Sequence, residues 1–117
     1  DLSAEQWTAL KEAWGGCAYC GASEVPLQRD CVLALSRGGR YTLDNIAPAC
    51  RSCNASKCND EVTGWLRRKR LDERTFLLRH HEIGRALVQQ FSAAENDADA
   101  EIDMESGPVD GGDGDES

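Results

Sequence analysis

The sequence predicts an α+β fold, a small domain in which a bound metal ion stabilises two short strands flanked by helices. Three observations predict it. Two Cys-x-x-C pairs bracket the middle of the chain, two short apolar segments lie between them, and helical periodicity precedes and follows this region. At 117 residues the chain has room for only a modest core, so we expect a metal or disulfide cross-link to help hold it.

The first segment, residues 1–16, is predicted to be an N-terminal helix over positions 3–14. Ser3 and Gln6 have the spacing of a capping box, and the glycines that follow position 14 supply a stop. The apolar residues that recur at helical spacing on its core face are Trp7, Leu10 and Trp14.

The middle segment, residues 17–70, is predicted to be a hairpin followed by two helices. Residues 27–35 and the stretch "IAPAC" have strand-like composition, and the loop "SRGGRYTLDN" separates them. A helix should begin near Cys50 to Cys53, and another should run through "EVTGWLRRKR" with Asp60 as its cap.

The C-terminal segment divides into a helix over residues 71–94, capped by Asp72, and an acidic tail over residues 95–117. The tail has ten Asp and Glu, no Lys or Arg and almost no apolar residue, so it cannot bury enough surface to offset the entropy of ordering. We expect it to be disordered. The apolar face of the preceding helix comprises Phe76, Ile83, Leu87 and Phe91.

Charge is distributed unevenly. The net charge of -8 comes from the tail, since residues 1–94 have thirteen basic and eleven acidic side chains. Twelve of these basic residues lie between positions 28 and 85, which favours a polyanion partner, although basic residues also merely solvate helix faces. With no 18-residue apolar run and no secretory leader, we expect no membrane span and an intracellular, cytoplasmic location.

Four cysteines form the strongest motif. "CAYC" and "CRSC" are separated by 29 residues, and each pair can direct two thiolates at one Zn²⁺ ion. Because four thiolates close a tetrahedral site, the ion would be structural. Two disulfides are the alternative. The proposed ligands are Cys17, Cys20, Cys50 and Cys53.

Between and after these pairs lie "RDC", "LSRGG", "LDN", "NIAPAC" and "CNASK", in that order. This arrangement resembles the HNH endonuclease family in its zinc-knuckle form. The resemblance implies a ββα-metal core and hydrolysis of phosphodiester bonds in duplex DNA with one divalent ion.

The resemblance also implies residue roles. Asp30 and Asn54 match the ligands of the catalytic ion, and Asn45 matches the asparagine that positions the general base. A carboxylate and an amide oxygen suit Mg²⁺ or Mn²⁺. Position 31, where the family has its general-base histidine, is Cys31.

Cys31 has three possible roles: a fifth thiol near the zinc, a disulfide partner of Cys58, or a substitute at the base position. As a substitute, a free thiol with a pKa of about 8.5 is mostly protonated near neutral pH. Losing a positioned general base typically costs about 10² to 10⁴ in rate. With cysteine in the place of the general base, we expect the nuclease activity to be reduced or abolished. The two histidines, His80 and His81, lie outside the motif and are expected to face solvent or the core.

Basic residues around the motif are expected to contact DNA phosphates without reading sequence. Three functions follow as hypotheses: a nuclease, a catalytically inactive zinc-stabilised nucleic-acid-binding module, or a zinc-stabilised protein-interaction domain. The acidic tail would compete with DNA or dock a protein partner. The expected phosphate contacts are Arg37, Arg40, Arg51, Lys57, Arg67 and Arg68.

Overall fold

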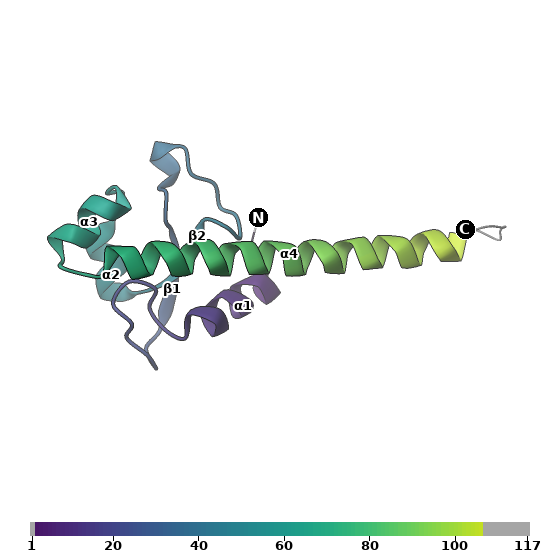
Figure 1. Ribbon diagram of the computed structural model, residues 1–117, viewed down its shortest axis with the longest axis horizontal. Coiled ribbons are helices and arrows are strands. Elements are labelled where there is room, and N and C mark those ends of the chain that lie inside the picture. The colour runs from purple at the N-terminus through teal and green to yellow at the C-terminus, as the bar shows by residue number, and fades with distance from the viewer. Residues whose placement is uncertain (1, 107–117) are drawn as a thin grey trace.

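The computed structural model describes residues 2–106, with side chains as far as position 93. At its centre is a two-stranded antiparallel sheet of β1 (Leu27–Cys31) and β2 (Ile46–Cys50), followed directly by α2 (Arg51–Lys57). Figure 1 shows the remaining helices around this unit. The strand, strand, helix order confirms the predicted α+β fold.

Helix α1 (Ala4–Trp14) begins and ends as its sequence predicts. The Ser3 side chain accepts from the Gln6 amide, the Gln6 side chain accepts from the Ser3 amide, and Gly15 adopts the left-handed conformation at the C-terminus. Leu10 and Trp14 are buried. The helix therefore covers the core with the face that its periodicity indicates.

The hairpin differs from the prediction at the end of its first strand. Residue pairing runs from Leu27 opposite Cys50 to Cys31 opposite Ile46, and β1 stops there instead of at position 35. The chain then turns through a short 3₁₀ helix, Leu35–Arg37. The Asn45 side chain accepts a hydrogen bond from the Leu33 amide and donates one to the Leu33 carbonyl. These two bonds take the place of further pairing between the strands.

Helix α3 (Val62–Arg68) has a different cap from the one expected. Glu61, not Asp60, accepts from the backbone amides of the first turn, at Thr63 and Gly64. Asp60 instead pairs with Arg68 at 2.7 Å. The cap is therefore one residue later than predicted, because Asp60 is engaged by the side chain of Arg68, the last residue of the helix.

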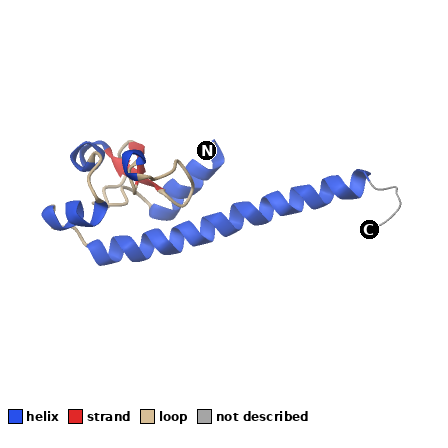
Figure 2. Ribbon diagram, turned by 90° about the horizontal axis from the view of Figure 1, so that it is seen from above, coloured by secondary structure: helices blue, strands red, loops and turns tan. Residues whose placement is uncertain are grey.

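Helix α4 (Glu73–Ser106) is the longest element, and the other elements gather along its N-terminal half (Figures 1 and 2). Asp72 caps it as predicted, accepting from the Thr75 amide at 3.0 Å. The helix continues past position 94, into the segment that we expected to be disordered. Residues 95–106 contain no glycine or proline, so no strong helix breaker occurs before Gly107. The rest of the predicted tail, residues 107–117, lies outside the described residues.

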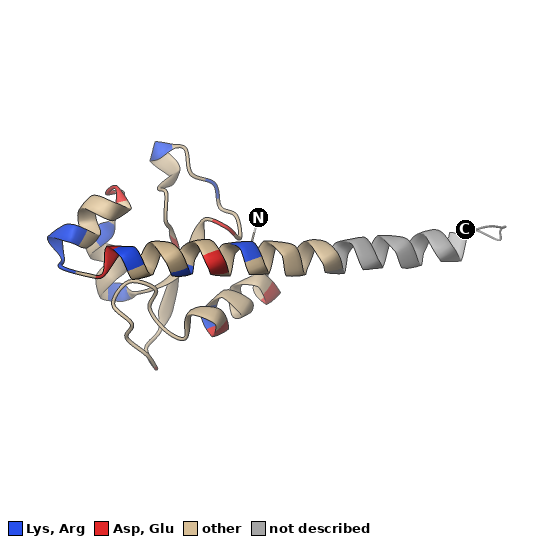
Figure 3. Ribbon diagram, viewed as in Figure 1, with Lys and Arg blue, Asp and Glu red and all other residues tan. Residues whose placement is uncertain are grey.

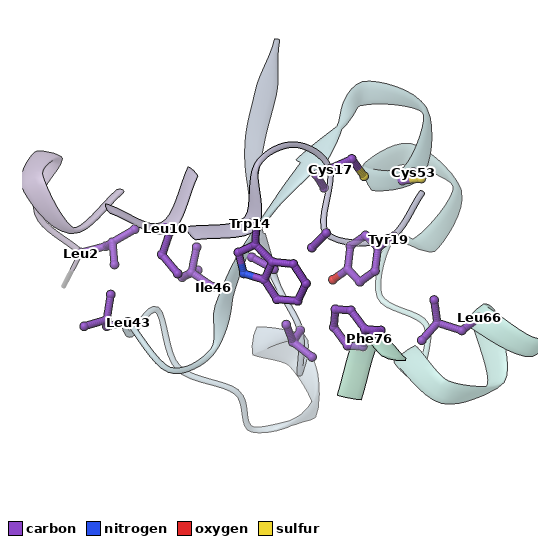
Figure 4. Close-up of a cluster of buried hydrophobic side chains, with 14 of the residues drawn as sticks. Leu2, Leu10, Trp14, Cys17, Tyr19, Leu43, Ile46, Cys53, Leu66 and Phe76 are labelled. Atoms are coloured by element: carbon purple, nitrogen blue, oxygen red, sulfur yellow. The ribbon is translucent and has the colours of Figure 1, made fainter. Parts of the chain in front are cut away.

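The core is an aromatic cluster between the hairpin and the helices (Figure 4). Tyr19 packs edge-on against Trp65, with ring centroids 5.2 Å apart, and against Phe76 at 5.0 Å. Trp14 stacks on Phe76 at 5.6 Å, so α1, α3 and α4 meet at these rings. None of the helices in the described part of the chain has the length and apolar character needed to cross a membrane.

Candidate functional site

The four cysteines of the two pairs form one cluster. Their sulfur atoms all lie within 4.8 Å of one another, and the sulfur atoms of Cys20 and Cys50 are 3.8 Å apart. The hairpin brings them together, because its pairing sets the end of β2 beside the turn that precedes β1. Cys53 then follows in the first turn of α2, and its amide donates to the sulfur of Cys50.

This geometry suits a tetrahedral ion. With metal–sulfur bonds of about 2.3 Å, tetrahedral ligands are about 3.8 Å apart. All six cysteines of the chain are free and lie within the described residues, so the disulfide alternatives are not present. Burial and the neighbouring sulfur of Cys17 raise the pKa of the Cys53 thiol, because both disfavour a further negative charge in the cluster. The cluster could hold a structural metal ion such as zinc.

A second candidate site lies at the opposite end of the hairpin from this cluster, where β1 ends. A pocket of about 320 Å³ is lined by Asp30, Cys31 and Asn54, three of the residues predicted from sequence. Asp30 and Cys31 come from β1 and Asn54 from α2. Four further residues complete the wall: Ala34, Leu35, Cys58 and Asn59.

The carboxylate of Asp30 is buried and held from two directions. Tyr19 donates its hydroxyl to Oδ2 at 2.5 Å, and the ammonium of Lys57 lies 3.1 Å from the same oxygen. Burial, together with the charge of Asp30, raises the pKa of Tyr19 well above its ordinary value, so this hydroxyl stays a donor. The second oxygen, Oδ1, has no hydrogen-bond partner among residues 2–93.

Asn54 offers a second oxygen to the pocket. Its amide nitrogen donates to Gln28 Oε1 at 2.7 Å, which turns the amide so that its Oδ1 has no hydrogen-bond partner among the residues with described side chains. One carboxylate oxygen and one amide oxygen are hard donors of the kind that Mg²⁺ and Mn²⁺ prefer. The residues present therefore fit a divalent ion that keeps several of its waters.

Asn45 lies at the base of the loop between the strands. Its Oδ1 accepts from the Leu33 amide at 2.9 Å, and its Nδ2 donates to the carbonyls of Leu33 at 3.0 Å and Arg40 at 2.8 Å. Its own carbonyl accepts from the Val32 amide. Asn45 thus fixes the backbone immediately after Cys31.

Cys31 is half-buried beside the Asp30 carboxylate. Burial first, and then the negative charge of Asp30, raise the pKa of its thiol, and Lys57 only partly opposes them. A thiol shifted in this direction is a poorer proton acceptor near neutral pH than a free cysteine.

The expected DNA contacts fall into three groups. Figure 3 marks the lysines and arginines in blue along the ribbon. Arg37, Arg40 and Arg51 are exposed, and Arg37 also donates to the Asn59 carbonyl at 2.8 Å. Two arginines on α3 are exposed but paired with carboxylates; these are Arg67 and Arg68. Lys57 contradicts the prediction, because its side chain is fully buried against Asp30 and cannot reach a phosphate on the surface.

Sequence reasoning missed the contacts that hold the side chains of Asp30 and Asn54. Tyr19 and Lys57 act on Asp30 through the folded core, and no local pattern signals this. Gln28 precedes Asp30 by two positions on a strand, so the period of a strand could have placed both side chains on one face. The two histidines line a different hollow, of about 680 Å³, between α4 and Asp44.

Residues 17–60 match the family model described as HNH endonuclease. This segment is similar to HNH endonuclease domains. The match begins at the first cysteine of the cluster and includes the hairpin, α2 and every residue that lines the pocket. No curated protein and no solved structure matches the chain. HNH domains are usually nuclease domains, so the family supports a nuclease or nucleic-acid-binding function.

Proposed function

We propose that this HNH domain is a DNA endonuclease site that hydrolyses phosphodiester bonds with one divalent ion, at a rate reduced by Cys31. One observation carries the proposal: Asp30, Cys31 and Asn54, from different elements, line a single pocket. In this account the four-cysteine cluster holds structural Zn²⁺ and takes no part in the chemistry.

Asp30 and Asn54 would hold Mg²⁺ or Mn²⁺ through the two oxygens that lack protein partners. When bound, such an ion stabilises the charge that develops on the phosphate and the leaving oxygen. Tyr19 and Lys57 fix the orientation of the Asp30 carboxylate, and Gln28 does the same for the Asn54 amide.

Cys31 occupies the place of the proton acceptor. Deprotonating a water there requires a thiolate, which the raised pKa disfavours. Asn45 positions this residue through the backbone that follows it. We therefore expect the cleavage that survives to depend on the metal ion more than on a protein base.

The exposed Arg37, Arg40 and Arg51 would bind the phosphates of duplex DNA without selecting a sequence. The acidic residues beyond position 94 would either compete with DNA for this surface or dock a protein partner.

A second candidate function is a catalytically inactive, zinc-stabilised nucleic-acid-binding module. The observation that favours it is the cysteine that lines the pocket at the base position, where burial and the charge of Asp30 raise the pKa of the thiol and disfavour the thiolate. The two functions share the fold and the basic surface and differ only in whether the pocket cleaves.

Relaxation of supercoiled plasmid in Mn²⁺ tests the proposal. The native chain should nick slowly, Asp30→Asn should lose this activity while still retarding duplex DNA in a gel, and Glu82→Gln, which changes an exposed carboxylate on α4, should nick as the native chain does. Nicking that Asp30→Asn does not alter contradicts the assignment of the pocket. Duplex binding with no nicking by the native chain supports the binding module.

A further inference from the structure

Lys57 is the last residue of α2, and its side chain is as inaccessible to solvent as any in the described structure, at 0% exposure. Its ammonium lies 3.1 Å from Asp30 Oδ2, donates to the Cys31 carbonyl at 2.9 Å and sits 6.0 Å from the centre of the Tyr19 ring. An ammonium is expensive to bury unless it is paired. These contacts provide the pairing.

Asp30 supplies the only carboxylate that lines the pocket within the described part of the chain. The ammonium of Lys57 balances the charge of this carboxylate even without a metal ion. Mg²⁺ sites in proteins usually rely on one or two carboxylates, whose negative charge attracts the ion. A divalent ion bound to Asp30 here would instead lie a few ångströms from a fixed positive charge, which repels it in a medium of reduced dielectric constant.

We propose that Lys57 is a positioning residue that acts as the resident counter-ion of Asp30 and weakens divalent-ion binding at the pocket. The inference rests on the nuclease function proposed above, since it takes Asp30 to be a ligand of the ion. Tyr19 donates to the same carboxylate oxygen, so the carboxylate keeps one of its two anchors when Lys57 is changed. Replacing Lys57 by methionine therefore chiefly removes the charge.

Mn²⁺ affinity of the zinc-loaded full chain, measured from the electron paramagnetic resonance signal of free Mn²⁺, tests the inference. Lys57→Met should bind Mn²⁺ about tenfold more tightly, or better, than the native chain. Lys57→Arg, which retains the charge, should bind as the native chain does. A Lys57→Met variant that binds Mn²⁺ with native or lower affinity overturns the proposal.

Asp30→Asn separates this outcome from failure of the proposed function. If Asp30→Asn binds Mn²⁺ as the native chain does, Asp30 is not a ligand and the proposed nuclease site is wrong. If it loses Mn²⁺ while Lys57→Met shows no gain, the site stands and only the role of Lys57 is refuted.

Lys57→Met leaves a buried carboxylate without its cation, which is a strongly destabilising change. If that variant does not fold in buffer without added Mn²⁺, folding in millimolar Mn²⁺ becomes the readout. Recovery of native circular dichroism and of the zinc content supports the proposal, because the ion then replaces the ammonium. No recovery overturns it.

Discussion

The two candidate metal sites of this chain lie on one hairpin and differ in how their charge is balanced. The cysteine cluster brings four sulfur donors within 4.8 Å of one another. The pocket at the end of β1 has a single carboxylate that Lys57 already neutralises. The first arrangement could hold a structural ion such as zinc, and the second has its negative charge paired without one.

The difference separates the two roles of metal in a small domain. A site whose donors repel one another couples ion binding to folding. A site with its own counter-ion folds first and binds an ion weakly, which suits an ion that must exchange ligands with a substrate. We expect three substitutions to change stability, with the largest effect at the cysteine cluster, a smaller one in the loop between the strands and the smallest on α4.

Loss of the cluster ion should have the largest effect. Structural zinc contributes about 10–16 kcal/mol of apparent binding free energy in small zinc domains, so Cys53→Ser should abolish cooperative unfolding. Thermal melting followed by circular dichroism measures it. Cys58→Ser is the matched control, because Cys58 is exposed and outside the cluster, and should change the free energy of unfolding by less than about 0.5 kcal/mol. Equal melting of the two variants would contradict the assignment.

Asn45→Ala should have an intermediate effect. The variant loses three hydrogen bonds to the loop backbone, which we expect to lower the free energy of unfolding by about 1–3 kcal/mol. Urea unfolding measures this, with Asn59→Ala, at an exposed asparagine, as the control. Faster amide hydrogen exchange at Leu33 should accompany the loss, and unchanged exchange there would show that Asn45 does not hold the loop.

The pH dependence tied to His80 should be the smallest effect. Burial lowers the pKa of His80 below its ordinary value of 6.5, an effect that Asp44 opposes and His81 adds to. The folded chain then binds fewer protons than the unfolded chain, so stability is full above pH 6.5 and falls as the pH drops below it. His80→Phe retains the stacking on Phe76 and should flatten this slope in urea titrations. An unchanged slope would place the dependence in another group.

Local patterns account for what the sequence predicted well. Capping by Ser3 and Asp72 needs only residues within one helical turn, and the cysteine pairs lie on either side of a hairpin whose second strand was predicted with its observed bounds. The early end of β1 depends on Asn45, which bonds to a backbone twelve residues away. Such a contact cannot be predicted from periodicity or composition.

Lys57 shows the same limit at the candidate site. A lysine close to a nuclease motif suggests a phosphate contact, and only the folded chain shows that it is buried against Asp30. Three of the residues that line the pocket, Asp30, Cys31 and Asn54, could be singled out because their positions match the family pattern. The ion pair between Asp30 and Lys57 could not be predicted, since it depends on how α2 packs on β1.

The central claim is that the pocket is a nuclease site whose base position is occupied by a thiol. Plasmid cleavage in Mg²⁺ or Mn²⁺ by the native chain and by Cys31→His tests it most directly, with zinc content measured on both. We predict that histidine at this position increases the cleavage rate by about 10² to 10⁴. If neither chain cleaves while both contain zinc, the nuclease account is contradicted.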